Sequence, residues 1–327
     1  MNKVLITLLL IFLGCSEHSL LSQKKPCYKR KKICNYQYLT NCYEKVAFDS
    51  LSNLYYSRSN LGSLFDGSCT TCHRNGVVQQ QITINNGRRH GADTSYYESG
   101  CPYSSQNYVN GIRHGESTEY YDSSNRVRTV VNHFMGALYG PFIVLDSKGD
   151  TIKYLEYANN LLNGVKREYY ENSKLKKAVD YKDGQIHGKQ INYSSDGKKQ
   201  LEVGYFEGLK DGFLTYFFDD ESIARKEEWN KGKKDGAFIT FNTKGDTLSQ
   251  QYFKKDVPID KHIENYPNKP KTIKNIKKYG KKGILIEETR NDERGQPIYE
   301  FKLEKKKKCR KKRKRKGEKK SGGKSID

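Results

Sequence analysis

The chain has 327 residues, of which 35% are hydrophobic, 12% aromatic and 30% charged. The hydrophobic fraction is below the roughly 45–50% of an average soluble domain, and the mean hydropathy of −0.91 argues against a membrane protein with many spans. Only 7 prolines accompany 28 glycines, which excludes collagen-like and proline-rich chains. The 25 tyrosines and 13 phenylalanines therefore carry much of the apolar surface.

The first fifteen residues form a short apolar segment that ends in a cysteine. The apolar run from Val4 to Leu13 is too short to span a bilayer core of about 30 Å as a helix, and it is typical of a signal peptide. The ending Phe12-Leu13-Gly14-Cys15 resembles the site at which a lipoprotein is cleaved and its cysteine lipidated, although Phe12 replaces the usual Leu. We predict a signal peptide over 1–14, lipidation of Cys15, and an exported lipoprotein anchored to a membrane of the cell envelope. The alternatives are ordinary secretion and an uncleaved anchor.

A basic segment follows near the end of the chain. Residues 305–320 contain thirteen Lys or Arg and one Glu, so they carry +12 of the total charge of +22. Like charges at this density repel one another, which predicts a disordered basic tail over 304–327. The tail is either simply solvated or a site for an anionic partner, namely lipid, surface polysaccharide or nucleic acid. The candidate residues for that partner are Lys305, Lys306, Lys307, Lys308, Arg310, Lys311, Lys312, Arg313, Lys314, Arg315 and Lys316.

The strongest pattern is a glycine pair that recurs with a period of 24 or 25 residues. The pairs are Gly87/Gly91, Gly111/Gly115, Gly136/Gly140, Asn160/Gly164, Gly184/Gly188, Gly208/Gly212 and Gly232/Gly236. Such a fixed period indicates a repeat architecture. Glycine supplies the positive φ angles of tight turns, so we expect both residues of each pair to lie in a turn.

Aromatic residues keep their position within each repeat. One column, five residues after the second glycine, contains Tyr96, Tyr120, Leu145, Tyr169, Tyr193, Phe217 and Phe241. The other, seventeen residues after it, contains Tyr108, His133, Tyr157, Tyr181, Tyr205, Trp229 and Phe253. A single hairpin cannot bury such rings, but stacked hairpins can. We therefore predict an all-β fold, an elongated stack of β-hairpins in a twisted antiparallel meander sheet, with the rings as its core.

The segment Asp183-Gly184-Gln185-Ile186-His187-Gly188, with Tyr193 after it, resembles the MORN repeat. The spacing of 24 residues looks most like the bacterial variant called YwqK-type antitoxin-like. The resemblance covers about 84–256, and it departs from the pattern at Asn160 and Leu145. It implies a hairpin stack that acts as a scaffold, in some cases connected with membrane lipids. The predicted organisation is 1–14 signal peptide, 15–60 linker, 61–86 divergent capping repeat, 87–256 repeats, 257–303 C-terminal cap hairpin and 304–327 tail.

Seven cysteines remain after Cys15, and export would let disulfides persist. Cys69-Thr70-Thr71-Cys72-His73 matches the C-x-x-C-H motif of haem attachment, but this segment is predicted as a strand. We instead expect a structural disulfide between Cys72 and Cys101, with Cys69–Cys101 as the competing pair. A haem or redox protein that uses Cys69, Cys72 and His73 stays as an alternative.

No catalytic or metal-binding constellation stands out. His90, His114 and His187 recur just before the second glycine, but successive units lie about 10 Å apart, too far for a shared metal. We expect no enzyme activity and no cofactor. The sequence predicts a binding or scaffold protein of the cell envelope with a protein or anionic surface partner, and oligomers could form through the open sheet edges. The alternative function is that of a YwqK-like antitoxin acting by protein binding.

Overall fold

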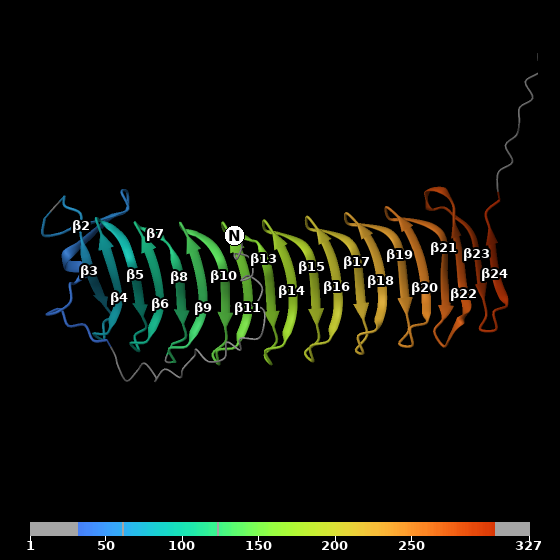
Figure 1. The fold of residues 1–327 in the computed structure, drawn as a ribbon, viewed down its shortest axis with the longest axis horizontal. Helices are drawn as coiled ribbons and strands as arrows, with labels where there is room; N and C mark the ends of the chain where they lie inside the picture. Colours follow the sequence, from blue (N-terminus) through green and yellow to red (C-terminus); the bar gives the residue numbers. More distant parts are fainter. Residues whose placement is uncertain (1–31, 61, 123, 305–327) are drawn as a thin grey trace, which may run out of the picture.

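The computed structural model describes residues 32–60, 62–122 and 124–304, so Cys15 and the basic tail from 305 lie outside the described residues. The chain forms a small N-terminal unit and one long sheet (Figure 1). The N-terminal unit contains α1 (Cys42–Lys45), β1 (Val46–Asp49) and β2 (Leu54–Ser57). It occupies part of the segment that the sequence predicted as a linker.

The sheet contains 22 strands that follow one another in chain order, with antiparallel pairing throughout. The first eleven are β3 (Gly67–Cys72), β4 (Val78–Asn85), β5 (Arg88–Tyr96), β6 (Pro102–Val109), β7 (Ile112–Arg113), β8 (Gly115–Tyr120), β9 (Val127–Phe134), β10 (Ala137–Leu145), β11 (Thr151–Ala158), β12 (Leu161–Leu162) and β13 (Gly164–Tyr169). The others are β14 (Leu175–Lys182), β15 (Gln185–Tyr193), β16 (Lys199–Phe206), β17 (Leu209–Phe217), β18 (Ile223–Asn230), β19 (Lys233–Phe241), β20 (Thr247–Lys254), β21 (Val257–Tyr266), β22 (Lys269–Tyr279), β23 (Leu285–Asn291) and β24 (Pro297–Lys302), with a short 3-10 turn, η2 (Lys281–Gly283), before β23. The sheet is open, with β3 at one end and β24 at the other, which confirms the predicted all-β meander.

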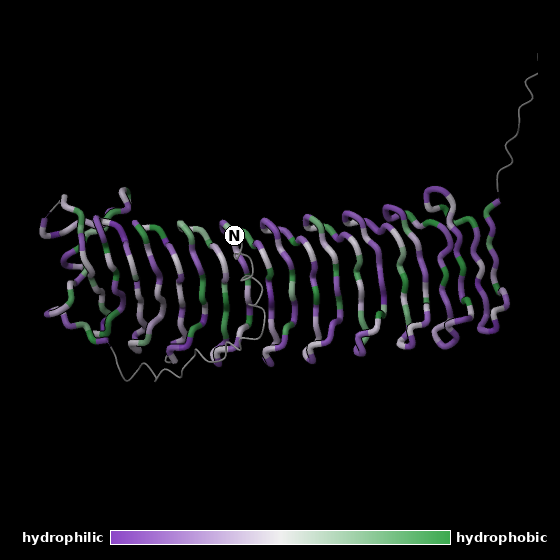
Figure 2. The backbone as a smooth tube through the Cα atoms, in the orientation of Figure 1, coloured by the Kyte–Doolittle hydropathy of each residue, from purple (hydrophilic) through white to green (hydrophobic). Residues whose placement is uncertain are grey.

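The first glycine of each pair lies in the turn between two strands. Asp183 and Gly184 have φ angles of 49° and 81°, the positive values that a two-residue hairpin turn requires. The Gly184 N–H donates to the carbonyl oxygen of Leu162 at 2.8 Å, so the turn also bonds to the preceding unit. Asn160 takes the glycine position with a φ of 67° and bonds in the same way to Leu138. Hydrophilic residues gather at these turns (Figure 2).

The second glycine of each pair was also predicted to lie in a turn, and this prediction is wrong. Gly91 lies inside β5 and Gly140 lies inside β10, each with a φ of 83°. Residues 90–92 lie opposite the single residue Thr83 of β4, and residues 139–141 lie opposite Asn132 of β9. The glycine therefore marks a bulge in the ladder, because a bulge requires a positive φ just as a turn does. The other second glycines follow the same rule: Gly188, Gly212 and Gly236 lie inside β15, β17 and β19, and Gly115 and Gly164 begin β8 and β13.

At several of these bulges the glycine makes room for a carboxylate from the neighbouring strand. Gly188 has a φ of 111°, and a Cβ there would lie 2.9 Å from the Cβ of Asp180. Asp180 Oδ2 accepts a hydrogen bond from the Lys189 N–H at 2.8 Å. Glu156 and Glu228 do the same for the residues after Gly164 and Gly236. The glycine therefore lets an acidic side chain satisfy the backbone at an irregular point of the ladder.

A line of paired residues across the sheet, which we call the central row, contains most of the buried side chains of β14 to β19. Its members are Cα partners on successive strands and so share one face. From β13 to β20 they are Lys166, Val179, Gln190, Val203, Leu214, Glu227, Phe238 and Gln251. Exposure is only 2% for Val179 and Leu214 and 3% for Val203 and Phe238. The predicted ring columns lie nearer the strand ends and, apart from Tyr108, are only half-buried. The second ring column lies two residues from the central row on each strand and the first lies three, so the core was predicted too near the strand ends.

Two disulfides fix the N-terminal unit to the end of the sheet. Cys34 bonds to Cys72, and Cys42 bonds to Cys69. The predicted Cys72–Cys101 and Cys69–Cys101 pairs are therefore wrong, because both β3 cysteines bond to the N-terminal segment; Cys101 is also disulfide-bonded. The sequence offered no repeat register over 15–60, so it did not show that this segment folds against β3. Disulfides of this kind are typical of an oxidising, exported environment.

The C-terminal part continues the sheet with two hairpins, β21–β22 and β23–β24, where one cap hairpin was expected. Among the residues that the structure describes, no helix has the length and apolar character needed to cross a membrane.

Candidate binding face

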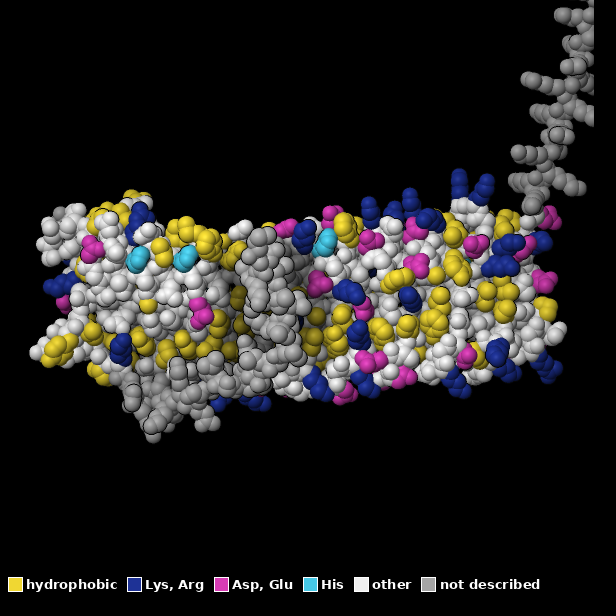
Figure 3. Space-filling view, viewed as in Figure 1, with side chains coloured by type: hydrophobic (Ala, Val, Ile, Leu, Met, Phe, Trp, Pro, Cys, Tyr) yellow, Lys and Arg dark blue, Asp and Glu magenta, His cyan; other side chains and the backbone are white. Residues whose placement is uncertain are grey.

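The face that carries the central row also carries the second ring column. Each ring of that column follows a central-row position by two residues on the same strand, as Tyr205 follows Val203 and Trp229 follows Glu227, so both point to one side. The column continues from Tyr108 on β6 to Phe253 on β20. Figure 3 shows hydrophobic side chains in rows along the long axis of one face. The arrangement is a long strip of half-exposed rings.

Cations cover this ring column at both ends. Lys210 Nζ lies 4.5 Å from the centre of the Trp229 ring, and Lys234 Nζ lies 5.0 Å from that of Phe253. At the other end, the Arg89 guanidinium lies 5.4 Å from the Tyr108 ring. Contacts of this length are favourable cation–π interactions. The strip therefore combines flat apolar rings with positive charge.

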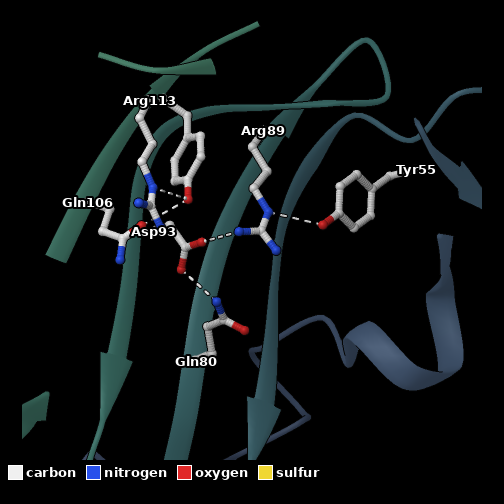
Figure 4. A network of polar contacts seen from close by, with 7 residues as sticks. Tyr55, Gln80, Arg89, Asp93, Gln106 and Arg113 are labelled. Atoms are coloured by element: carbon white, nitrogen blue, oxygen red, sulfur yellow. Dashed lines mark hydrogen bonds and ion pairs between the residues drawn. The ribbon is translucent and has the colours of Figure 1, made fainter. Parts of the chain in front are cut away.

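A polar network joins the N-terminal unit to this face (Figure 4). The buried Asp93 carboxylate binds Arg89 Nη1 at 2.8 Å and accepts a hydrogen bond from Gln80 Nε2 at 2.7 Å. Arg89 Nε donates to the hydroxyl of Tyr55 on β2 at 3.0 Å. Burial acts to lower the pKa of Arg89, but Tyr55 and Asp93 raise it above its ordinary value, so the guanidinium stays charged. Both Asp93 oxygens are satisfied, which favours a structural role over catalysis.

The same combination of cation, carboxylate and ring recurs on β18. Glu227 is buried in the central row, and its Oε1 lies 2.6 Å from Arg225 Nε. Its Oε2 accepts a hydrogen bond from Trp229 Nε1 at 2.9 Å. On β23, Glu288 pairs with Arg290 at 2.8 Å, and Arg290 covers the Tyr299 ring. The hydrogen bond from Arg290 lowers the pKa of Glu288.

A shallow pocket of about 540 Å³ opens on the face beside the N-terminal unit. It is lined by Tyr43, Tyr96, Tyr97, Tyr103, His73 and five further residues. His73 Nε2 bonds to the backbone oxygen of Tyr96, so this imidazole is held against β5. A second hollow of about 400 Å³ lies over β20, β21 and β22 and is lined in part by Tyr252 and Tyr279. Tyr252 directly precedes Phe253 on β20, so it points to the face opposite the ring column.

The proposed haem motif has no free thiols in the structure, because Cys69 and Cys72 are both in disulfides. The haem and redox alternative is therefore wrong for the folded, oxidised chain. His90, His114 and His187 lie in separate units, and no group of His, Cys, Asp and Glu in the described part of the chain could hold a metal ion. The Nδ1 atoms of His90 and His114 are buried without a hydrogen-bond partner among the described residues.

One column of tyrosines that joins neighbouring repeats was not predicted from the sequence. It lies one residue beyond the first ring column, where a tyrosine hydroxyl bonds to the next unit. The bonds run from Tyr97 to Tyr120, from Tyr121 to Leu145, from Tyr170 to Tyr193 and from Tyr266 to Asn291. The paired tyrosines, as in Tyr169-Tyr170, were the available signal.

Comparison with known proteins agrees with this architecture. Residues 162–183 match the profile of the MORN repeat variant. No curated protein matches the chain. Solved structures that resemble it include the Tc holotoxin pore of Photorhabdus luminescens, at 12% identity over 79% of this chain, and TcdB2-TccC3, at 11% identity over 72%. This chain covers only 17% and 18% of those chains, and both TM-scores are 0.17, so neither likeness bears on function. The repeat match, together with the hairpin sheet, supports a MORN-repeat protein.

Proposed function

We propose that this chain is a non-enzymatic scaffold of the cell envelope, anchored by a lipid on Cys15, that binds an extended partner along its ring strip. The observation that carries the proposal is the continuous ring column from Tyr108 to Phe253 on one face. A long, flat strip of rings suits a partner that lies across many units. The disulfides of the N-terminal unit support an exported location.

The anchor is tested by the intact mass of the protein extracted from its native membrane, denatured but not reduced. We expect a mass that begins at Cys15 with added acyl groups and with the disulfides intact. A mass that begins at Met1 would contradict the anchor and favour the antitoxin interpretation.

Whether binding is confined to the face that carries the strip is tested with a photo-crosslinking amino acid placed on β17 in the native envelope. Tyr216 and Phe213 are similarly exposed, at 41% and 50%, but odd and even spacing from Leu214 places them on opposite faces. We expect a discrete adduct from position 216 and none from position 213. Equal labelling from both positions would contradict a one-sided binding strip.

The basic tail is a second contact in this proposal. Binding of the full chain to vesicles that contain anionic lipid should fall steeply as salt rises, and deletion of 305–320 should abolish it. The double variant Lys210→Ala/Lys234→Ala measures the contribution of the strip to the same binding. The control is Lys231→Ala/Lys255→Ala, which removes two cations from the turns.

A further inference from the structure

The two ends of the sheet differ in whether they can accept another strand. At the β3 end, the Thr70 N–H donates to the carbonyl oxygen of Thr40 at 2.8 Å, and Asn41 pairs with Thr70 as a parallel bridge. The Cys42–Cys69 disulfide fixes this contact covalently. The β3 edge is therefore covered by the chain itself.

At the other end, within the described residues 32–304, β24 pairs with β23 and with no further strand. Its hydrophobic side chains are exposed, with 69% for Ile298 and 45% for Tyr299, and Leu303, which directly follows the strand, is 48% exposed. An edge strand of this kind is a template for a further strand.

The outward hydrogen-bonding groups of β24 follow from its pairing with β23. The Leu303 N–H donates to the carbonyl oxygen of Ile286 at 2.8 Å, so the peptide groups of Leu303 point toward β23. Peptide direction alternates along an antiparallel strand. The N–H and C=O groups of Glu300 and Lys302 therefore point outward, away from the sheet.

We propose that a second copy of this chain pairs with β24 in antiparallel fashion, about a two-fold axis at Phe301. In this register Glu300 faces Lys302 of the second copy, and Lys302 faces Glu300 of the second copy. Because these two residues carry the outward peptide groups, both pairs are also the hydrogen-bonded pairs of the ladder. On the other face, Phe301 meets its own copy, and Tyr299 meets Leu303 of the second copy.

The charges of Glu300 and Lys302 favour a two-fold axis at Phe301 over an axis one residue to either side. A two-fold axis at Glu300 would place that carboxylate opposite its own copy, and an axis at Lys302 would do the same for the ammonium group. Like charges directly opposite each other are destabilising, whereas unlike pairs contribute to pairing. Lys302 is 80% exposed on its side chain, so its 3.4 Å contact with Glu287 leaves it accessible.

The covered β3 edge also determines the size of the assembly. A chain with two open edges would add copies without limit, whereas a chain with one open edge closes as a two-fold dimer. The pairing involves one short strand and is smaller than a standard interface of about 1,600 Å². We therefore expect a dimer that depends on protein concentration.

Sedimentation velocity of the full processed chain, at physiological ionic strength and over a series of concentrations, tests the proposal. We expect a shift toward twice the chain mass as concentration rises. Glu300→Lys and Lys302→Glu should each weaken the dimer by at least about tenfold, since each creates two like-charge pairs. An equal mixture of the two variants should restore the dimer, because every cross-strand pair is again unlike. Hydrogen exchange at Glu300 and Lys302 should slow in the dimer.

The control is Glu171→Lys, an exposed charge reversal in a turn between β13 and β14, which should dimerise as the unchanged chain does. A wild-type chain that stays monomeric, or variants whose mixture fails to dimerise, would overturn the proposal. Deletion of 305–320 tests the alternative that the chain's own basic tail, and not a second copy, pairs with β24. If the tail covered β24, only the deleted chain would dimerise, and that result would also overturn the proposal.

Discussion

The hydroxyl of Tyr170 donates a hydrogen bond to the backbone oxygen of Tyr193, which lies one repeat further along the chain, at 2.8 Å. Three other tyrosines make the same bond at the same repeat position, at Tyr97, Tyr121 and Tyr266. The units are therefore joined by side chains at their turn end as well as by the strand ladder.

Replacing Tyr170 with Phe removes this bond and keeps the ring. We expect a loss of about 0.5–1.5 kcal/mol in the stability of the neighbouring units. Hydrogen exchange around 170–193 measures it better than a global melt, because repeat arrays need not unfold in one step. Tyr38→Phe is the control, since Tyr38 is exposed. An equal effect of both changes would show that the hydroxyl of Tyr170 has no special role.

Alanine at the second glycine should have a cost that depends on the neighbouring carboxylate. Gly212 has a φ of 84° with nothing within 4 Å of an added Cβ, whereas a Cβ at Gly188 meets Asp180. Gly212→Ala should lose about 1–2 kcal/mol from the left-handed backbone alone. Gly188→Ala should lose about 1–2 kcal/mol more, because it displaces the carboxylate that accepts from Lys189. Urea unfolding followed by circular dichroism compares the two variants, and equal losses would contradict the close approach of Asp180.

Stability should fall as the solution becomes mildly acidic. The His262 ring packs between Phe253 and Tyr279, and its Nε2–H donates to the Tyr252 oxygen. Burial lowers the pKa of His262 below its ordinary value of 6.5, and nearby Lys277 adds to this effect. The unfolded chain then binds more protons, so the contribution is present above pH 6.5 and is lost as the pH falls below it.

Thermal melts between pH 8 and pH 5 measure this effect. We expect His262→Gln to flatten the pH dependence while keeping a donor for the Tyr252 oxygen. Burial also lowers the pKa of His133, which leaves a residual slope of the same sign. An unchanged slope in the His262 variant would show that its imidazole does not couple to folding.

Reduction should open one end of the molecule and leave the rest intact. The Cys34–Cys72 and Cys42–Cys69 bonds link positions 38 and 27 residues apart, and the loss of each should cost about 3–4 kcal/mol. Reduction also breaks the disulfide of Cys101, which directly precedes β6. Because repeats contact only their neighbours, faster hydrogen exchange should be confined to 32–109. The double variant Cys34→Ser/Cys72→Ser, measured without reductant, lacks only one of the disulfides. It should therefore show a smaller increase in hydrogen exchange over the same residues. A loss of protection as far as β16–β20 would indicate long-range cooperativity.

The sequence predicted the regular part of the fold because each hairpin turn repeats the same backbone requirement, as Gly184 and Gly208 show. It wrongly assigned Gly91 and Gly140 to turns, because a strand bulge and a turn both require a positive φ and look alike in a glycine pattern. Only the pairing of the strands distinguishes the two.

Other features were hidden for different physical reasons. The sequence predicted a core nearer the strand ends, because the periodic aromatic residues are the most visible pattern in the sequence. The buried residues are instead small and medium aliphatic side chains such as Val179 and Leu214. The disulfides could not be predicted, since Cys34 and Cys42 belong to a segment without a repeat register. The network of Arg89 with Asp93 and Tyr55 was equally hidden, because it joins residues of two separately organised parts.

The single-layer meander also has a mechanical consequence. The ladder hydrogen bonds point along the long axis of the sheet (Figure 1), so a pull between its two ends loads them directly. Under a load in this direction, the hydrogen bonds of one strand pair break before those of the next, so the strand pairs separate in sequence and not in a single concerted shear. Each released 24-residue unit adds about 80 Å of extended chain. Under tension between a membrane and a bound partner, the protein would lengthen stepwise and act as an extensible tether.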